Sequence, residues 1–112
     1  MATIYKILRL DEWAELSAKG QTNGAAIDLQ DGYVHFSTAE TVRETAQKYF
    51  ADEGDLKLLA YDDAAFGEAL QYEPARGGVL FPHLYAPLIL ADALWVADLP
   101  RDGATHKFPD EL

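Results

Sequence analysis

One ten-residue segment, DGYVHFSTAE, combines residue types that can bind a ligand or move a proton. In an extended strand, Tyr33, His35 and Ser37 share one face, while Val34 and Phe36 point to the core. An imidazole between two hydroxyl-bearing side chains can hydrogen-bond a sugar hydroxyl or a carboxamide, or act as a general base near neutral pH. The alternative is a half-buried histidine bonded to nearby backbone. We expect His35 to be catalytic and Tyr33 and Ser37 to bind ligand.

The last four residues of this segment, STAE, match a capping box, in which Ser37 bonds a helix N–H and Glu40 reaches back. The pattern predicts a helix over residues 39–50. The free N–H groups at its start would attract an anion close to His35. Thr38, at the same helix start, is therefore a further candidate for ligand binding.

A second segment, EPARGG, could hold an anionic group. Gly77 and Gly78 would let the backbone approach a ligand closely, and Arg76 offers a planar fork for a carboxylate or phosphate. Glu73 is the acidic residue of this segment and the second catalytic candidate. The alternative is a surface turn in which Arg76 pairs with Glu73, an interaction worth little.

The third segment, FPHLY, supplies two more ligand-binding candidates, His83 and Tyr85. No metal site is expected, because His35, His83 and His106 are scattered, without HxH or HExxH spacing, and the chain has no cysteine. The triplet HFS fits the His-x-Ser/Thr pattern of phosphoesterases that carry two such motifs. The second copy is missing, because Leu84 and Tyr85 follow His83, so this remains a minor alternative.

Composition narrows the classes of partner. The 112 residues carry a formal charge of −10, which disfavours nucleic acid and anionic membranes as partners. The chain has neither a signal-peptide pattern at its start nor a long apolar run, and its lack of cysteine suits a reducing compartment. We expect an acidic, cytoplasmic protein that binds a small molecule and whose protein partners are unknown.

The elements that must position these residues alternate between strand and helix patterns. The sequence predicts a single α+β domain over residues 1–100, with a curved, mostly antiparallel sheet and two main helices. A polar tail, expected to be loose at its end, occupies residues 101–112. The expected elements are a strand at 4–8, a helix at 11–19 capped by Asp11 and ended by Gly20, a loop at 21–30, strands at 56–61 and 69–73, a brief edge strand at 79–81 and a closing strand at 93–99.

The three segments DGYVHFSTAE, EPARGG and FPHLYAPL, taken together, resemble an uncharacterised family of small bacterial proteins, a domain of unknown function. The resemblance covers roughly residues 3–99. It implies an ADP-ribosyltransferase-like fold, in which a split and strongly curved antiparallel sheet forms a cleft that binds NAD in active relatives.

The resemblance also implies roles for individual residues. His35 would contact a ribose, Tyr33 or Tyr85 would stack on nicotinamide, and Glu73 would act on the ribose. No cofactor is required, and NAD would be a substrate. The implied reaction is ADP-ribosyl transfer or NAD cleavage, although no Glu-x-Glu motif is present, so the fold could be kept without the chemistry.

The rival expectation is a non-catalytic interaction domain that binds a protein through its proline-rich loop. It predicts an exposed apolar patch around Phe81, Leu84 and Tyr85, and no deep pocket near His35.

Overall fold

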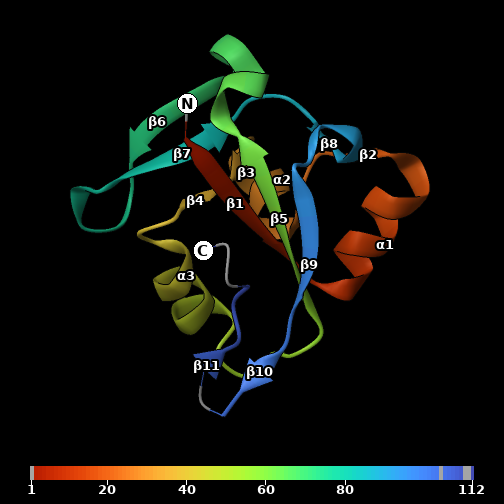
Figure 1. The fold of residues 1–112 in the computed structure, drawn as a ribbon. Coiled ribbons are helices and arrows are strands. Elements are labelled where there is room, and N and C mark those ends of the chain that lie inside the picture. The colour runs from red at the N-terminus through yellow and green to blue at the C-terminus, as the bar shows by residue number, and fades with distance from the viewer. Residues whose placement is uncertain (1, 104, 110–111) are drawn as a thin grey trace.

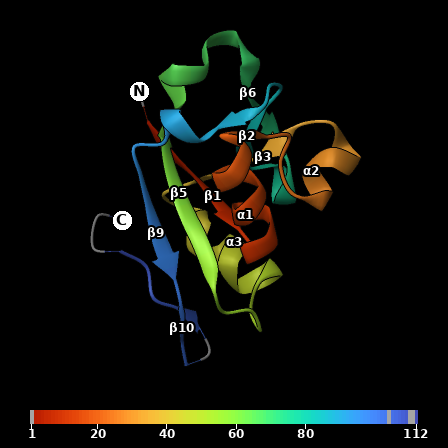
Figure 2. The same ribbon diagram turned by 90° about the vertical axis from the view of Figure 1, so that its right-hand side faces the viewer.

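The computed structural model describes residues 2–103, 105–109 and 112, and the side chain of Arg76 lies outside its description. The chain forms one α+β domain in which every assigned strand pair among these residues is antiparallel, as the sequence predicts. Figures 1 and 2 show helices α1 and α3 on opposite sides of the long central strands.

Two sheets make up most of the structure. The larger runs in the order β4-β1-β5-β9, with β1 at Thr3–Leu8, β4 at Ser37–Thr38, β5 at Leu56–Asp62 and β9 at Trp95–Leu99. The smaller runs in the order β3-β7-β6, with β3 at Val34–His35, β6 at Leu70–Pro74 and β7 at Leu80–Leu84. Two short ladders join β2 (Gln21–Thr22) to β8 (Leu88–Ile89) and β10 (Arg101–Asp102) to β11 (Thr105–His106).

The helices are α1 at Leu10–Lys19, α2 at Ala26–Asp31 and α3 at Val42–Tyr49, with 3₁₀ turns η1 at Asp63–Ala69, η2 at Arg76–Gly78 and η3 at Leu90–Asp92. Helix α1 ends at Gly20 as predicted, with φ +77°. The predicted cap at Asp11 is wrong, because Arg9 occupies the cap position and its N–H donates to the Glu12 carboxylate over 2.8 Å.

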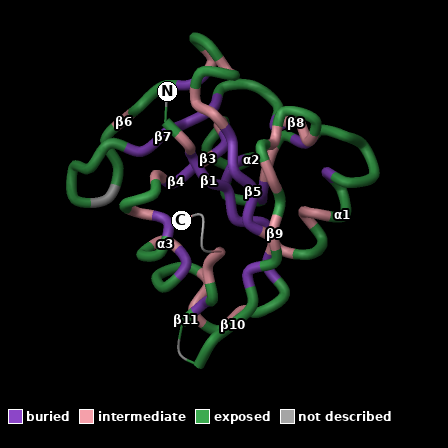
Figure 3. Tube along the Cα trace, viewed as in Figure 1, coloured by how far each residue is buried: buried purple, intermediate pink, exposed green. Residues whose placement is uncertain are grey.

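Alternation along β1 divides the core in two. Ile4 and Leu8 face one cluster, which includes Leu16 of α1, and Tyr5 and Ile7 face another, which includes Val42 of α3. Figure 3 shows the buried residues concentrated along β1 and β5. Burial of this apolar surface on both faces holds the larger sheet between its helices.

The chain changes sheet at Phe36, which corrects the predicted capping box. Ser37 pairs with Tyr5 in the larger sheet, while His35 belongs to the smaller one. Helix α3 begins only at Val42, without a side-chain cap at its N-terminus. The local STAE pattern could not reveal this, because pairing with β1 is a contact across more than thirty residues.

Two further predictions are corrected. The expected loop at 21–30 contains β2 and α2, a helix of only six residues, which is too short for apolar periodicity to reveal. The expected edge strand at 79–81 is β7, the central strand of the smaller sheet, where Pro82 accepts a hydrogen bond from Phe36 N over 2.9 Å.

The described part of the tail carries secondary structure. Strands β10 and β11 form a hairpin, and His106 Nε2 lies 2.7 Å from the carbonyl oxygen of Glu53. His106 is buried, so this hairpin packs against the domain, while residues 110–111 at the end predicted to be loose lie outside the described residues.

Candidate functional site

The smaller sheet presents one face to the core and another to a group of polar rings. Val34 and Leu84 are buried in the core, and the neighbouring His35 and His83 are paired across β3 and β7 on the opposite face. We call the group formed by these two histidines with three nearby side chains the His35–His83 cluster. Its members are Tyr33, His35, Glu73, His83 and Tyr85.

The ring of Tyr33 lies against both histidines, with centroid distances of 4.6 Å to His35 and 4.3 Å to His83. Tyr85 is the next ring, 5.2 Å from Tyr33. The predicted shared face of Tyr33 and His35 is therefore confirmed. The rings differ in exposure, because the His83 side chain is only 5 % exposed while that of His35 is 30 % exposed. His83 is therefore the buried ring of the cluster, and His35, Tyr33 and Tyr85 form its accessible side.

Glu73 links the two strands of the β6–β7 hairpin within the cluster. Its Oε1 lies 2.8 Å from His83 Nδ1 and accepts a hydrogen bond from the Tyr85 hydroxyl over 2.7 Å. These two hydrogen bonds hold the pKa of Glu73 below its ordinary value, and the bond from Tyr85 contributes more than the bond from His83. The hydrogen bond between Tyr85 and Glu73 also raises the pKa of Tyr85 to about 12. At neutral pH the cluster therefore offers a carboxylate beside a protonated phenol.

His35 lies between two carboxylates. Its Nδ1 is 2.6 Å from Asp28 Oδ1, and its Nε2 is 3.0 Å from Asp31 Oδ2. Asp28 is fully buried and also pairs with Lys6 Nζ at 2.7 Å. Burial alone would raise the pKa of Asp28, but the hydrogen bond from His35 and the charge of Lys6 outweigh it and lower the pKa to about 2.

Each histidine of the cluster thus has a carboxylate at Nδ1. This arrangement orients an imidazole and favours the tautomer with hydrogen on Nδ1. The exposed side combines aromatic faces, a phenol and acidic oxygens, which can stack on a planar ring and bind hydroxyl groups.

Two of the predicted binding residues lie apart from the cluster. Ser37 is buried, and its hydroxyl donates to Thr45 Oγ1 over 3.0 Å. The hydroxyl of Thr38 lies 3.0 Å from that of Thr41 rather than beside the rings of the cluster. Both belong to β4 in the larger sheet, so the structure gives them a structural environment rather than a place beside His35.

The predicted anion loop lies at the tip of the β6–β7 hairpin. Gly77 and Gly78 adopt φ of +62° and +79°, which only glycine takes without strain. The predicted role of Arg76 rests on a side chain outside the described structure. The last strand pair of the hairpin, Pro74 with Leu80, lies three residue pairs from His83, about 10 Å along the sheet, and the two glycines lie beyond it.

Sequence reasoning missed the acidic and basic partners of His35. Asp28 and Asp31 lie on α2. The sequence pattern predicts a loop around Asp28 and places Asp31 at the start of the segment DGYVHFSTAE, and Lys6 lies on the first strand. A signal did exist, because Lys6 occupies a core-facing position between Ile4 and Leu8. A lysine at such a position requires a buried partner.

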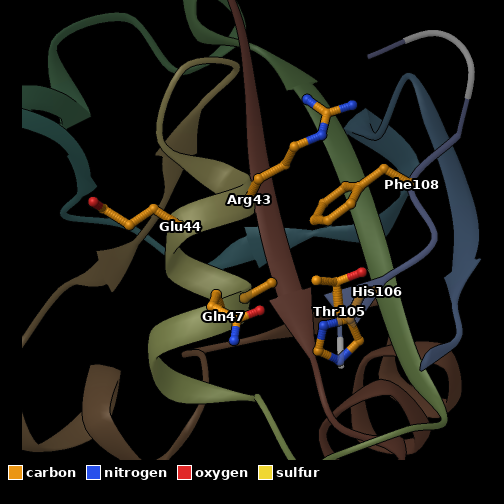
Figure 4. Close-up of a pocket in the computed structure, with 7 residues that line it drawn as sticks. Arg43, Glu44, Gln47, Thr105, His106 and Phe108 are labelled. Carbon is orange, nitrogen blue, oxygen red and sulfur yellow. The ribbon is translucent and has the colours of Figure 1, made fainter. Parts of the chain in front are cut away.

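A groove of about 420 Å³ lies elsewhere, between α3 and the C-terminal hairpin, lined by Arg43, Glu44, Ala46, Gln47, Thr105, His106 and Phe108. Figure 4 shows Arg43 beside the Phe108 ring, with Gln47 facing His106 across the groove. A second cavity lies beside Glu15 and Asn23. Neither of these two cavities is lined by His35 or His83.

Within the described ranges, no group of three or more His, Cys, Asp or Glu side chains stands close enough to hold a metal ion. Nor does any helix described here have the length and apolar character needed to cross a bilayer.

A family model described as "Protein of unknown function (DUF952)" matches residues 7–96. The chain belongs to the DUF952 family. This confirms the resemblance to a domain family of unknown function. No curated protein matches this DUF952 chain.

Solved structures of one bacterial protein are similar to this DUF952 member. The crystal structure of protein CC0527 from Caulobacter crescentus is 42% identical, with a TM-score of 0.89 over 94% of this chain and 93% of that one. The solution NMR structure of CC0527 is 43% identical, with a TM-score of 0.84 over 95% of this chain and 91% of that one. At this identity the two proteins share the α+β fold over nearly their whole lengths.

Proposed function

We propose that this chain binds a nucleotide-like small molecule at the His35–His83 cluster, and that its reaction, where it has one, is ADP-ribosyl transfer or NAD cleavage. One observation carries the proposal: the rings of Tyr33 and Tyr85 lie beside His35 and an ionised Glu73. A planar heterocycle can stack on the tyrosines while ribose hydroxyls bond the imidazole and carboxylates.

The charge of the cluster favours one end of such a ligand. Asp31 and Glu73 border the exposed side, so a cationic nicotinamide ring and neutral hydroxyls suit it better than phosphate does. Phosphate groups would lie toward the backbone of Gly77 and Gly78, beyond the last strand pair of the hairpin, which is about 10 Å from His83.

Glu73 has the properties that the proposed reaction needs. When the bond between ribose C1′ and the nicotinamide nitrogen breaks, nicotinamide leaves with the electron pair and positive charge develops on the ribose. An ionised carboxylate stabilises that charge until water or an acceptor hydroxyl adds to C1′ and releases its proton to the solvent. Because its pKa is lowered by the bonds from Tyr85 and His83, Glu73 is ionised at neutral pH.

Titration calorimetry with NAD, ADP-ribose and nicotinamide tests binding, and an assay for released nicotinamide tests turnover. Binding of ADP-ribose should be lost in His35→Ala and Tyr85→Ala. Tyr72→Ala is the matched control, because Tyr72 is a similarly exposed tyrosine whose hydroxyl bonds Asp63 rather than Glu73. No binding of any of the three ligands at millimolar concentration would overturn the proposal.

The alternative is a protein-interaction domain. Its expected apolar patch is wrong in two of three residues, because Phe81 and Leu84 are buried and only Tyr85 is exposed. We therefore favour the small-molecule proposal.

A further inference from the structure

The carboxylate of Asp28 is held by four hydrogen bonds. Oδ2 accepts from Lys6 Nζ and from the N–H of Ala25, both over 2.7 Å. Oδ1 accepts from the N–H of His35 over 3.0 Å and lies 2.6 Å from His35 Nδ1. With two donors on each oxygen and no exposed side-chain surface, the carboxylate has a single orientation.

The loop before α2 closes over this carboxylate. Gly24 has φ of +107°, and a Cβ built on it would lie 2.3 Å from Asp28 Oδ2. Any other residue at position 24 would displace the carboxylate or the loop. The site around Asp28 is thus packed as well as hydrogen-bonded, which leaves its oxygen atoms little freedom to move.

Lys6 completes the arrangement from the other sheet. Its side chain is 6 % exposed, and its Nζ donates to the carbonyl oxygen of His35 over 3.0 Å as well as to Asp28. Lys6 and Asp28 together therefore bond the N–H, the C=O and the ring of one residue, His35.

The chemistry of the buried partner determines that Nδ1 carries hydrogen. An ionised carboxylate only accepts hydrogen bonds, so the nitrogen 2.6 Å from Asp28 must be a donor. Nε2 lies 3.0 Å from the Asp31 carboxylate on the exposed side, so a ligand that bonds Nε2 must take the place of Asp31 there. A carboxylate in this position fixes both the tautomer and the direction of an imidazole.

We propose that Asp28 and Lys6 are positioning residues that hold His35 with hydrogen on Nδ1 and present Nε2 to the ligand. The ligand part of this inference rests on the proposed function, whereas the ring state does not. Asp28 and Lys6 touch no ligand themselves and act only through His35.

The ring state is measured first on the unliganded wild-type protein. Long-range ¹H–¹⁵N spectra of the histidine rings distinguish a nitrogen that carries hydrogen from one that does not. We expect Nδ1 of His35 to show the protonated shift throughout pH 6–9. An unprotonated Nδ1 with hydrogen only on Nε2 would overturn the proposal whether or not any ligand binds.

The variant Asp28→Asn then tests whether Asp28 determines the tautomer of His35. Its amide oxygen is needed by the charged Lys6 and the N–H of Ala25, so its NH₂ must face His35. The backbone N–H of His35 then loses its acceptor, and the ring should change to the Nε2–H tautomer. The matched control is Asp31→Asn, which alters the exposed partner and should leave Nδ1 protonated. Retention of the Nδ1–H form in Asp28→Asn would contradict the inference.

Ligand affinity provides the second reading. If ADP-ribose binds the wild type, Asp28→Asn should weaken it tenfold or more while the circular dichroism spectrum is unchanged, and equal affinity would overturn the positioning role. If the wild type binds no ligand, the proposed function fails but the ring measurement still decides whether Asp28 sets the tautomer. If Asp28→Asn does not fold, the wild-type ring state remains decisive.

Discussion

Asp28 Oδ1 lies 2.6 Å from His35 Nδ1, a contact that joins the short helix α2 to strand β3 through a fully buried carboxylate. The same carboxylate pairs with Lys6 on β1. Asp28 therefore connects α2 to a strand of each of the two sheets. Stability and the geometry of the candidate site therefore depend on the same residues.

Replacement of Lys6 by methionine should destabilise the fold by about 3–5 kcal/mol, because it leaves the buried Asp28 charge without its partner. Urea unfolding measures the change in free energy. The control is Lys57→Met, which removes an ion pair with the exposed Asp98 and should cost less than about 1 kcal/mol. Equal decreases in the free energy of unfolding in the two variants would show that the buried ion pair contributes no more to stability than the exposed one.

Acid should remove the contribution of Asp28. Its pKa is lowered from 3.8 to about 2 in the folded protein, so the stabilisation is fully present above about pH 4 and is lost as the pH falls toward 2. The shift corresponds to roughly 2 kcal/mol. As the pH is lowered from 6 to 2, the free energy of unfolding should fall less steeply in Asp28→Asn than in the wild type. Parallel curves would contradict the assignment.

Tyr85→Phe should raise the pKa of Glu73, because the Tyr85 hydroxyl makes the largest contribution to keeping that carboxylate ionised. Titration of the Glu73 carboxyl carbon by NMR measures it. Tyr72→Phe is the matched control, since its hydroxyl bonds Asp63 and its loss should leave Glu73 unchanged. An unaltered Glu73 in Tyr85→Phe would mean that the hydrogen bond is not formed in solution.

Ser37→Ala should lower stability by about 1 kcal/mol, through loss of the bond to Thr45, and should leave ligand affinity unchanged. Thermal unfolding and calorimetry with ADP-ribose give the two readings. Weaker binding with unchanged stability would restore the role expected of Ser37 from the sequence and would contradict the separation of β4 from the cluster.

Local sequence patterns correctly predicted features that depend only on neighbouring residues. The apolar run at 56–61 is β5, and the alternation of Tyr33 with His35 places both rings together, because strand residues two apart share a face. Ser37, two residues further, breaks this pattern only because the chain crosses to the other sheet at Phe36. That crossing depends on pairing with distant strands, which no local motif reports.

The partners of the site residues were predictable only in part. The contact of Glu73 with His83 follows from the register of one hairpin. The contact of His35 with Asp28 and Lys6 joins residues up to 29 positions apart, in elements that pack only when the whole domain folds. A buried lysine in the first strand signals that such a partner exists without identifying it.

The most direct test of the central claim is an NMR titration of the labelled wild-type protein with ADP-ribose. The account predicts that the amides of residues 33–35 and 83–85 shift together and saturate with one dissociation constant. No shifts at millimolar ligand, or shifts confined to the groove around Arg43 and Phe108, would contradict the assignment of the His35–His83 cluster as the ligand site.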